Sequence, residues 1–267
     1  MAIDSSRFKV FKAKLQAAFI HLGCGATVIG VVVGLLYHLW FPAPYGGVVA
    51  ATGLLLILAV CDVICGPLLT LVVYHPQKSL RERWLDASVI VLIQLCALGY
   101  GVWTMAQARP VYVVFEVDRF RVITASEIDP AELPKAPLNL RELPWSGPRW
   151  IATRAPRNSD ELLESIKLSL SGLETSLRPD WWESLEQSKS AVQRKLQTVE
   201  RLVLARPQQK WAIEGVLIEI SAKGHVAVEN IRWLPVVSSK SNDWVVFVER
   251  KSLKPLAALP IDGFIEN

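Results

Sequence analysis

Cysteine is confined to the first part of the sequence and does not occur after Cys96. The C-terminal part, 109–267, therefore contains no disulfide framework, and it must be stabilised by a hydrophobic core, which a chain of this length can supply. Cys61 and Cys65 have the spacing of one helical turn, which could indicate a metal pair. Because they lie in an apolar segment, we interpret them as small packing residues instead.

Groups typical of catalysis are scarce as well. The C-terminal part contains one histidine, His225, and the sequence has no glycine-rich phosphate loop, Cys/His metal cluster or G-x-S-x-G motif. Pairs of acidic residues, such as Glu183 with Glu186, are typical of a solvated helix surface. These absences predict a protein that is not an enzyme, with no catalytic residue, no metal ion and no cofactor.

Charged residues are missing from three long stretches near the N-terminus. These are Leu15–Ala59, Val63–Gln77 and Ala87–Ala108. A helix needs about 20 apolar residues to cross the ~30 Å of hydrocarbon in a bilayer. The motif FPAPYGG at 41–47 divides the first stretch, because its prolines and glycines predict a turn. We therefore expect three transmembrane helices, at about 16–40, 48–74 and 85–107, the first being too long for a cleaved signal peptide.

Basic residues predict the orientation of these helices, since they favour the cytoplasmic side of a membrane. They occur in the N-terminal tail and in the loop between the second and third helices, whereas 41–47 has none. The residues concerned are Arg7, Lys9, Lys12, Lys14, Lys78, Arg81 and Arg83. We expect a multi-pass protein of the bacterial inner membrane, with a cytoplasmic N-terminus, a membrane domain at 1–108 and a periplasmic domain at 109–267.

The charge balance differs between these two domains. Residues 1–108 contain seven basic and four acidic residues, whereas 109–267 contain twenty-two and twenty-one. A nearly neutral outer domain argues against a nucleic-acid partner, which needs a concentrated basic surface. The basic excess of the membrane domain suits anionic membrane lipids as partners.

The outer domain is predicted to have an α+β fold, with a mostly antiparallel sheet and two helices. β-branched and aromatic residues nearly alternate over 111–123 with a break at Asp118 and Arg119, which predicts a hairpin or one bent strand. The proline-rich segment 129–148 is expected to be a surface loop. Helices are expected at 158–172 and 179–205. Further strands are expected in AIEGVLIEIS, HVAVENIRWLPVV, DWVVFVER and PLAALPI.

Asp62 lies near the centre of the second predicted span, LLLILAVCDVICGPLLTLVV. An ionisable side chain at this depth costs about 2.5–3.5 kcal/mol or more, and it usually faces water or a protein partner. Pro67 lacks a backbone N–H group, so we expect a kink beside the acid. Inside the bundle, Asp62 could be satisfied by Thr70, Gln94 or Thr27. Alternatively, it contacts a partner protein, and the sequence leaves both readings open.

Small residues recur at every fourth position of the first predicted helix, at Ala26, Gly30 and Gly34. Such a face lets two helix backbones approach closely. The helix that packs on this face can belong to the same bundle, which is the more frequent case, or to another protein.

Three segments, taken together, resemble one known family. They are CDVICGPLLTLVVYHPQKS, YGVWTMAQARPVYVVFEVDRFRVITASEI and RWLPVVSSKSNDWVVFVERKSLKPLAALPIDGF. The sequence resembles the TfpX/TfpZ family of type IV pilin accessory proteins over most of its length, and least over about 130–205. This resemblance implies a non-enzymatic inner-membrane protein that assists assembly of its cognate major pilin into type IV pili. Inner-membrane components of the pilus assembly machine are further candidate partners.

A type IV pilin has a long apolar helix in the inner membrane and a globular head in the periplasm, which matches the layout predicted for this chain. We therefore expect the membrane domain to contact the pilin helix and the outer domain to contact its head. The candidate contacts are Asp62, Gly66, Pro67 and Thr70 in the span, and Arg109, Tyr112, Phe115, Asp118 and Arg119 at the start of the outer domain.

Two other functions are compatible with such a membrane protein. A membrane enzyme that modifies the pilin, such as a glycosyltransferase, would usually have more spans and acidic or metal-binding loops, which the sequence lacks. A periplasmic sensor would need a cytoplasmic output module, whereas the expected cytoplasmic segments are short. The accessory role is therefore the favoured prediction.

Overall fold

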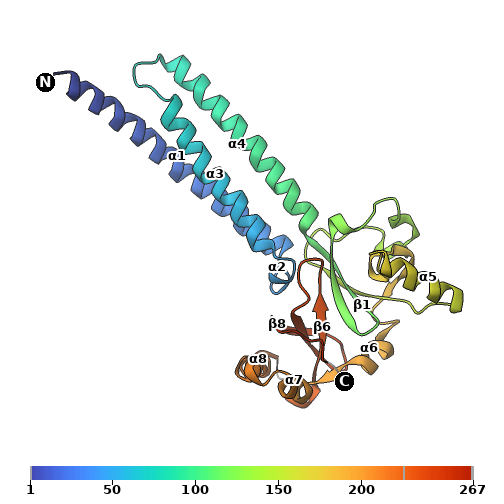
Figure 1. Ribbon diagram of the computed structural model, residues 1–267. Coiled ribbons are helices and arrows are strands. Elements are labelled where there is room, and N and C mark those ends of the chain that lie inside the picture. Colours follow the sequence, from blue (N-terminus) through green and yellow to red (C-terminus); the bar gives the residue numbers. More distant parts are fainter. Residues whose placement is uncertain (1, 225, 266–267) are drawn as a thin grey trace. The chain divides into compact units, whose positions relative to one another are not determined.

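The computed structural model describes residues 2–224 and 226–265 of the chain, so His225 lies outside the described residues. The chain forms two compact units (Figure 1). Unit 1 comprises Met1–Leu39 and Ala51–Gln107, and unit 2 comprises Trp40–Ala50 and Ala108–Asn267. The short segment Trp40–Ala50 thus belongs to the same unit as the C-terminal part.

Unit 1 is built from three long helices: α1 (Ala2–Trp40), α3 (Ala51–Val73) and α4 (Leu80–Ala108) (Figure 1). Each is long and apolar enough to cross a membrane, which confirms the predicted transmembrane helices. α1 begins at Ala2 instead of near residue 16. The Lys and Arg residues that precede the apolar part are good helix formers, so they extend the helix beyond it.

α4 also begins earlier than predicted, at Leu80 instead of near residue 85, because Ser79 and Glu82 form a capping box. The Glu82 carboxylate accepts a hydrogen bond from the Ser79 N–H at 2.8 Å, and the Ser79 hydroxyl accepts one from the Glu82 N–H at 3.3 Å. Farther along, a Cβ atom on Gly101 would lie 2.2 Å from Cδ1 of Leu58. Glycine at this position therefore lets α3 and α4 approach closely.

Unit 2 contains a mixed sheet with strand order β4-β3-β1-β2-β6-β7-β8, and β5 pairs with β6. The strands are β1 (Pro110–Glu116), β2 (Arg119–Thr124), β3 (Arg149–Thr153), β4 (Trp182–Ser184), β5 (Gln197–Thr198), β6 (Ile231–Val237), β7 (Trp244–Glu249) and β8 (Pro255–Leu259). The β1–β3 and β2–β6 pairs are parallel, and the other described pairs are antiparallel. The predicted α+β fold with a mostly antiparallel sheet is confirmed, and β1 and β2 form a hairpin.

The first predicted helix of this unit is confirmed as α5 (Ser159–Leu170). Asn158 is its N-cap, because its side-chain oxygen accepts a hydrogen bond from the N–H of Glu161 at 2.8 Å. The helix ends before Gly172, whose φ of +94° is a conformation that glycine adopts without strain.

The predicted helix at 179–205 is wrong as a single element. The chain forms β4, α6 (Lys189–Lys195), β5 and α7 (Val199–Ala205) in this region. Strand pairing overrides the helical spacing of the apolar residues in this region, since Trp182 pairs with Thr153 and Thr198 pairs with Arg232. These pairs need an extended backbone, and local periodicity does not reveal them.

The predicted strand in AIEGVLIEIS is wrong as well, because this segment lies in the helix α8 (Lys210–Gly224). Ile213, Leu217 and Ile220 are spaced by four and three residues and are all buried. The β-branched composition concealed this helical spacing. The other three predicted strands are confirmed as β6, β7 and β8.

Two clusters of buried side chains stabilise unit 2. The first is formed by strands β1, β2, β3 and β4 and by the loop that follows β2. It consists of Val111, Tyr112, Val114, Ile123, Ala125, Ile128, Ala136, Leu140, Ile151 and Trp182. The second joins α7 and α8 to β6 and β7, and consists of Val199, Leu202, Ile213, Leu217, Ile220, Ile231, Trp233, Val245, Phe247 and Ile261. The predicted loop at 129–148 is confirmed apart from two short 3-10 turns, and it covers the first cluster.

The segment Trp40–Ala50, which contains the short helix α2 (Tyr45–Val48), packs on the rest of unit 2. Nε1 of Trp150 donates a hydrogen bond to the hydroxyl of Tyr45 at 2.8 Å, and the hydroxyl of Ser238 donates one to the carbonyl of Val48 at 2.8 Å. The segment between the first two candidate spans and the C-terminal part therefore belong to one folded unit.

Candidate functional site

A cluster of polar side chains lies inside unit 1, where α1, α3 and α4 meet. Asp62, Gly66 and Thr70 are four residues apart, so they lie along one face of α3. Oγ1 of Thr70 lies 2.6 Å from Nδ1 of His21 on α1, and Nε2 of the same imidazole lies 2.7 Å from Oε1 of Gln94 on α4. One histidine thus links all three helices.

Because Gly66 has no side chain, the side chains of His21 and Gln94 can occupy the space beside it. A Cβ atom at this position would lie 2.2 Å from Nε2 of Gln94 and 2.8 Å from Nε2 of His21. Both distances are far below van der Waals contact, so any larger residue would displace the two side chains. The structure therefore gives Gly66 a role in forming the cluster itself.

Asp62 is buried, with 7% of its surface exposed. Nε2 of Gln94 donates to the backbone carbonyl of Asp62 at 3.3 Å, while the carboxylate atom Oδ2 is buried and has no hydrogen-bond partner among the described residues. Thr70 is paired with the histidine, and Thr27 donates to a carbonyl of its own helix. None of the three predicted internal partners therefore satisfies this carboxylate oxygen.

Asp62 lines an open cavity of about 320 Å³ between α1 and α4, which we name the Asp62 groove. The other lining residues are His21, Cys24, Gly25, Val28, Ile29, Val91, Gln94, Leu95 and Leu98. A carboxylate oxygen without a partner is costly in such apolar surroundings. The groove thus suits an apolar ligand that carries a hydrogen-bond donor.

His21 is not among the predicted site residues, although the sequence contains a signal for it. His21 is an ionisable residue in a span without Asp, Glu, Lys or Arg, and ionisable residues in spans are usually functional. Pro67 lies within α3, which continues as one helix from Ala51 to Val73. The kink expected at Pro67 stays a prediction.

The small-residue stripe of α1 does not pack inside unit 1. Ala26, Gly30 and Gly34 are exposed, and no described atom lies within 4 Å of a Cβ built on either glycine. Packing within the bundle, the more frequent case expected from the sequence, is therefore not observed for this stripe.

The four cysteines are free and exposed, so Cys61 and Cys65 are not buried in unit 1. Cys24 lines the Asp62 groove, whereas Cys61, Cys65 and Cys96 do not. Within the part of the chain that the structure describes, no three His, Cys, Asp or Glu residues form a group that could hold a metal ion.

Two outer-domain candidates are core residues. Tyr112 is 0% exposed and Phe115 is 5% exposed. The Tyr112 hydroxyl donates to the carbonyl of Leu140 at 3.0 Å, and burial raises the pKa of this phenol. In this structure neither residue is accessible to a partner. Arg109 lies nearer the surface, with its guanidinium 5.3 Å from the ring centre of Trp145.

The turn between β1 and β2, Val117–Asp118, is exposed, and together with the adjoining Arg119 we name it the hairpin tip. Asp118 and Arg119 form an ion pair at 3.2 Å on this surface. Val117 is 66% exposed and has a φ of +57°. A β-branched residue in this left-handed conformation costs about 1–2 kcal/mol, so the tip combines exposure with backbone strain.

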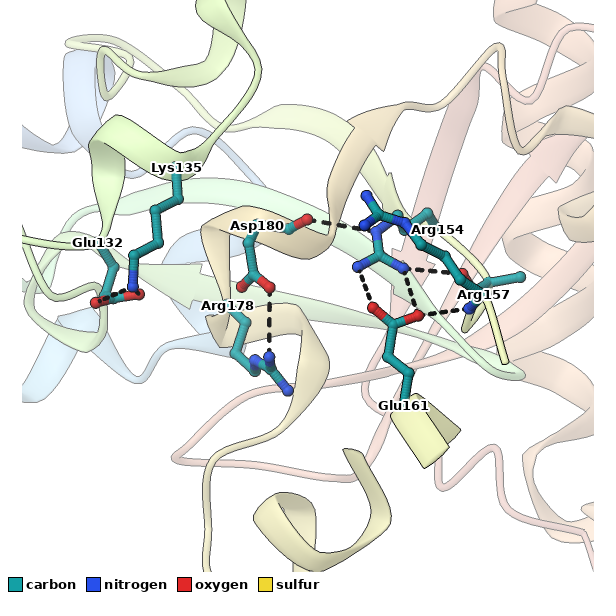
Figure 2. A network of polar contacts seen from close by, with 8 residues as sticks. Glu132, Lys135, Arg154, Arg157, Glu161, Arg178 and Asp180 are labelled. Carbon is teal, nitrogen blue, oxygen red and sulfur yellow. Dashed lines mark hydrogen bonds and ion pairs between the residues drawn. The ribbon is translucent and has the colours of Figure 1, made fainter. Parts of the chain in front are cut away.

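A network of charged residues fixes α5 to unit 2 (Figure 2). Arg154, directly after β3, forms two hydrogen bonds with Glu161, at 2.6 and 3.0 Å. Arg154 and Arg178 both lie over the ring of Trp181, at 4.4 and 5.2 Å from its centre. The hydrogen bonds from Arg154 and from the backbone N–H of Arg157 lower the pKa of Glu161 to about 2.

α5 exposes its apolar side in this arrangement. Ser165 is 7% exposed, whereas four apolar residues are between 44% and 85% exposed. These four, Leu162, Leu163, Ile166 and Leu170, share one side of the helix and form what we name the α5 face. An exposed apolar surface of this kind is typical of a protein-binding site.

Comparison with known proteins gives consistent matches. The family model described as "Fimbrial assembly protein FimB" matches residues 9–50. The chain is 33% identical over 267 residues to "Fimbrial assembly protein, serogroup I" of Dichelobacter nodosus, covering 98% of this chain and 99% of the relative. It is 32% identical, with the same coverage, to the serogroup E1 protein of that organism. The protein of serogroups C1 and C2 is 40% identical over 134 residues, which is 50% of this chain. No solved structure matches with significant similarity.

Proposed function

Because this chain belongs to the family of fimbrial assembly proteins, we propose that it assists assembly of its cognate major pilin into type IV pili. The resemblance to TfpX/TfpZ accessory proteins supports a type IV pilin as the partner. The three spans support a place in the bacterial inner membrane, and the basic residues that flank them support a cytoplasmic N-terminus and a periplasmic unit 2. The proposed role is non-enzymatic, which means that the protein holds the pilin and does not modify it.

The observation that carries this proposal is the unpaired carboxylate oxygen of Asp62 in an open, mostly apolar groove. An apolar helix would cover the walls of the groove, and a hydrogen-bond donor on that helix would satisfy the carboxylate. The groove is lined by residues of α4 from Val91 to Leu98 and by residues of α1 from His21 to Ile29, so a bound helix would contact both. The membrane helix of the pilin is the proposed occupant.

A second contact is proposed on the periplasmic side, between unit 2 and the pilin head. The hairpin tip and the α5 face are the exposed surfaces that support it, since one is strained and the other is apolar. Changing Leu163 to Lys would place a charge on the α5 face without affecting a core position. We expect this variant to fold and to co-purify less pilin than the wild type.

Native cysteines allow a direct test of the groove. A variant that retains Cys24 alone carries a thiol in the Asp62 groove, and a variant that retains Cys61 alone carries an exposed thiol outside it. Each would be produced with a pilin that has one engineered cysteine in its membrane helix, and the cells would be oxidised mildly. We expect a disulfide to the pilin from Cys24 and little from Cys61. Equal yields from both would reject the groove as the binding site.

The Asp62→Leu variant tests the carboxylate. We expect it to fold and insert normally, because leucine is compatible with an apolar span, and to lose co-purification with the pilin. Undiminished co-purification would remove Asp62 from the contact.

The mass of the pilin separates the proposed role from an enzymatic one. Deleting the gene for this protein should leave the mass of the pilin unchanged while reducing the number of pili. A change in pilin mass would instead support a membrane enzyme that modifies it.

A further inference from the structure

A second open cavity, of about 460 Å³, lies among α1, α3 and α4 at the end of unit 1 where α4 begins. Its size is within the range of about 300–1,000 Å³ that is usual for ligand sites. Seven apolar residues line it: Ala17, Ile20, Val73, Leu80, Ala87, Ile90 and Val91. The other lining residues are His21, Thr70, Tyr74, Arg83, Trp84 and Asp86. We name it the Arg83 cavity.

Arg83 brings a positive charge to this cavity. Its Nε atom is buried and has no hydrogen-bond partner in the part of the chain that the structure describes. The acidic residue of the cavity, Asp86, is already paired with Lys78 at 2.6 Å. The remaining polar groups of the lining are uncharged or weakly basic, so an anionic group from outside the chain would complement the Arg83 guanidinium.

Aromatic residues place the cavity near a membrane surface. Tyr74 and Trp84 both line it, and Trp84 is 73% exposed. Tyr and Trp are typical of the level of lipid headgroups, and a basic residue at that level attracts anionic lipids. Two of the apolar lining residues, Ile90 and Val91, lie farther along α4 and would face the hydrocarbon of a bilayer.

We propose that the Arg83 cavity binds one anionic phospholipid, with an acyl chain between the helices and its phosphate at Arg83. Charge complementarity favours a phospholipid over an apolar helix of another protein, because such a helix would leave the buried Nε of Arg83 unpaired. The proposal does not depend on pilin binding, because the site is complete within this chain.

The test uses full-length protein purified in a neutral detergent and native mass spectrometry of the bound lipid. The probes are phosphatidylglycerol and phosphatidylcholine with identical acyl chains, and inorganic phosphate as a competitor. We expect one phosphatidylglycerol to be retained, about fivefold or more tightly than phosphatidylcholine, as is typical of one basic residue at a membrane surface. Equal retention of the two lipids, or displacement of phosphatidylglycerol by an equal concentration of phosphate, would overturn the proposal.

Variants locate the site. Arg83→Gln should reduce retention of phosphatidylglycerol to the level of phosphatidylcholine, and Arg83→Lys should preserve most of it. Arg81 is exposed in the same turn and does not line the cavity, so Arg81→Gln is the matched control and should behave like the wild type. Ala87→Trp keeps Arg83 but fills the cavity, and it should reduce retention as well. The proposal fails if both glutamine variants lose lipid equally, or if a peptide of the pilin membrane helix displaces the lipid.

Discussion

The hydroxyl of Ser238 donates a hydrogen bond of 2.8 Å to the carbonyl of Val48, a residue 190 positions earlier in the chain. The same hydroxyl accepts hydrogen bonds from the N–H groups of Lys240 and Ser241, at 3.0 and 3.1 Å. Ser238 therefore fixes both its own turn and the segment Trp40–Ala50. Phe41, at the start of that segment, is 0% exposed, so the attachment is apolar as well as polar.

Gly47 offers a test of this attachment. A Cβ atom on Gly47 would lie 2.9 Å from two ring carbons of Trp244, so Gly47→Ala should force the segment away from β7. We expect the free energy of unfolding to fall by about 1–3 kcal/mol, as is typical of overpacking. Thermal unfolding in detergent measures the effect. Gly53→Ala, where no described atom lies within 4 Å, is the control and should not destabilise the protein.

Gly66 is the corresponding test for the polar cluster in unit 1. Because an added methyl group would collide with His21 and Gln94, Gly66→Ala should cost about 1–3 kcal/mol of stability. It should also reduce pilin co-purification, since the cluster positions the walls of the Asp62 groove. Gly30→Ala adds the same methyl group to a span at an open position, so it should leave both measurements near the wild-type values. If Gly66→Ala equals Gly30→Ala in both stability and pilin co-purification, the predicted collision with His21 and Gln94 is contradicted.

The pH dependence of stability follows from the pair of Arg154 and Glu161. The pKa of Glu161 is lowered to about 2 in the folded chain, from an ordinary value of 4.5. The stability that the ionised carboxylate contributes is therefore complete above about pH 4.5, and it is lost as the pH falls toward about 2. We expect the wild type to lose more unfolding free energy than Glu161→Gln when the pH is lowered from 5 to 2.

Chemical denaturation at several pH values measures this difference. Glu164→Gln removes a carboxylate from the exposed side of the same helix, and it should retain the wild-type pH profile. Parallel profiles for the wild type and Glu161→Gln would show that the pair does not stabilise the fold.

Val117 predicts a stabilising change. Its φ of +57° is unfavourable for a β-branched residue, whereas asparagine tolerates this conformation. Because Val117 is 66% exposed, Val117→Asn should remove strain without loss of core contacts and raise stability by about 1 kcal/mol. A higher midpoint in thermal unfolding would support this expectation. Unchanged or lower stability would indicate that the valine is held by contacts at the tip.

The membrane spans and the strand-forming character of 111–123 could be predicted from sequence because their causes are local. A bilayer requires a continuous apolar run, and the break at Asp118 interrupts an alternating pattern. The pairing of His21 could not be predicted in the same way, since its partners lie 49 and 73 positions away. Tyr112 was a candidate contact, but an alternating pattern does not show that a distant loop covers its face.

The strands β4 and β5 show the same limit. Trp182 and Thr198 are extended because Thr153 and Arg232 are beside them, and no local feature of 179–205 indicates those partners. The sequence indicated Asp62 as a site residue, because an ionisable side chain in an apolar span is costly, but it did not indicate the groove. Its remaining polar wall depends on helix packing, which the sequence does not specify.

The attachment of Trp40–Ala50 imposes an order on biogenesis. The segment lies between the first two candidate spans, but Ser238, which holds it through Val48, is translated 190 residues after that valine. At about 5–20 residues per second, the ribosome needs roughly 10–40 s to synthesise the intervening chain. The segment must remain without its final contacts for this interval, so unit 2 can only be completed once β6 and β7 have been synthesised.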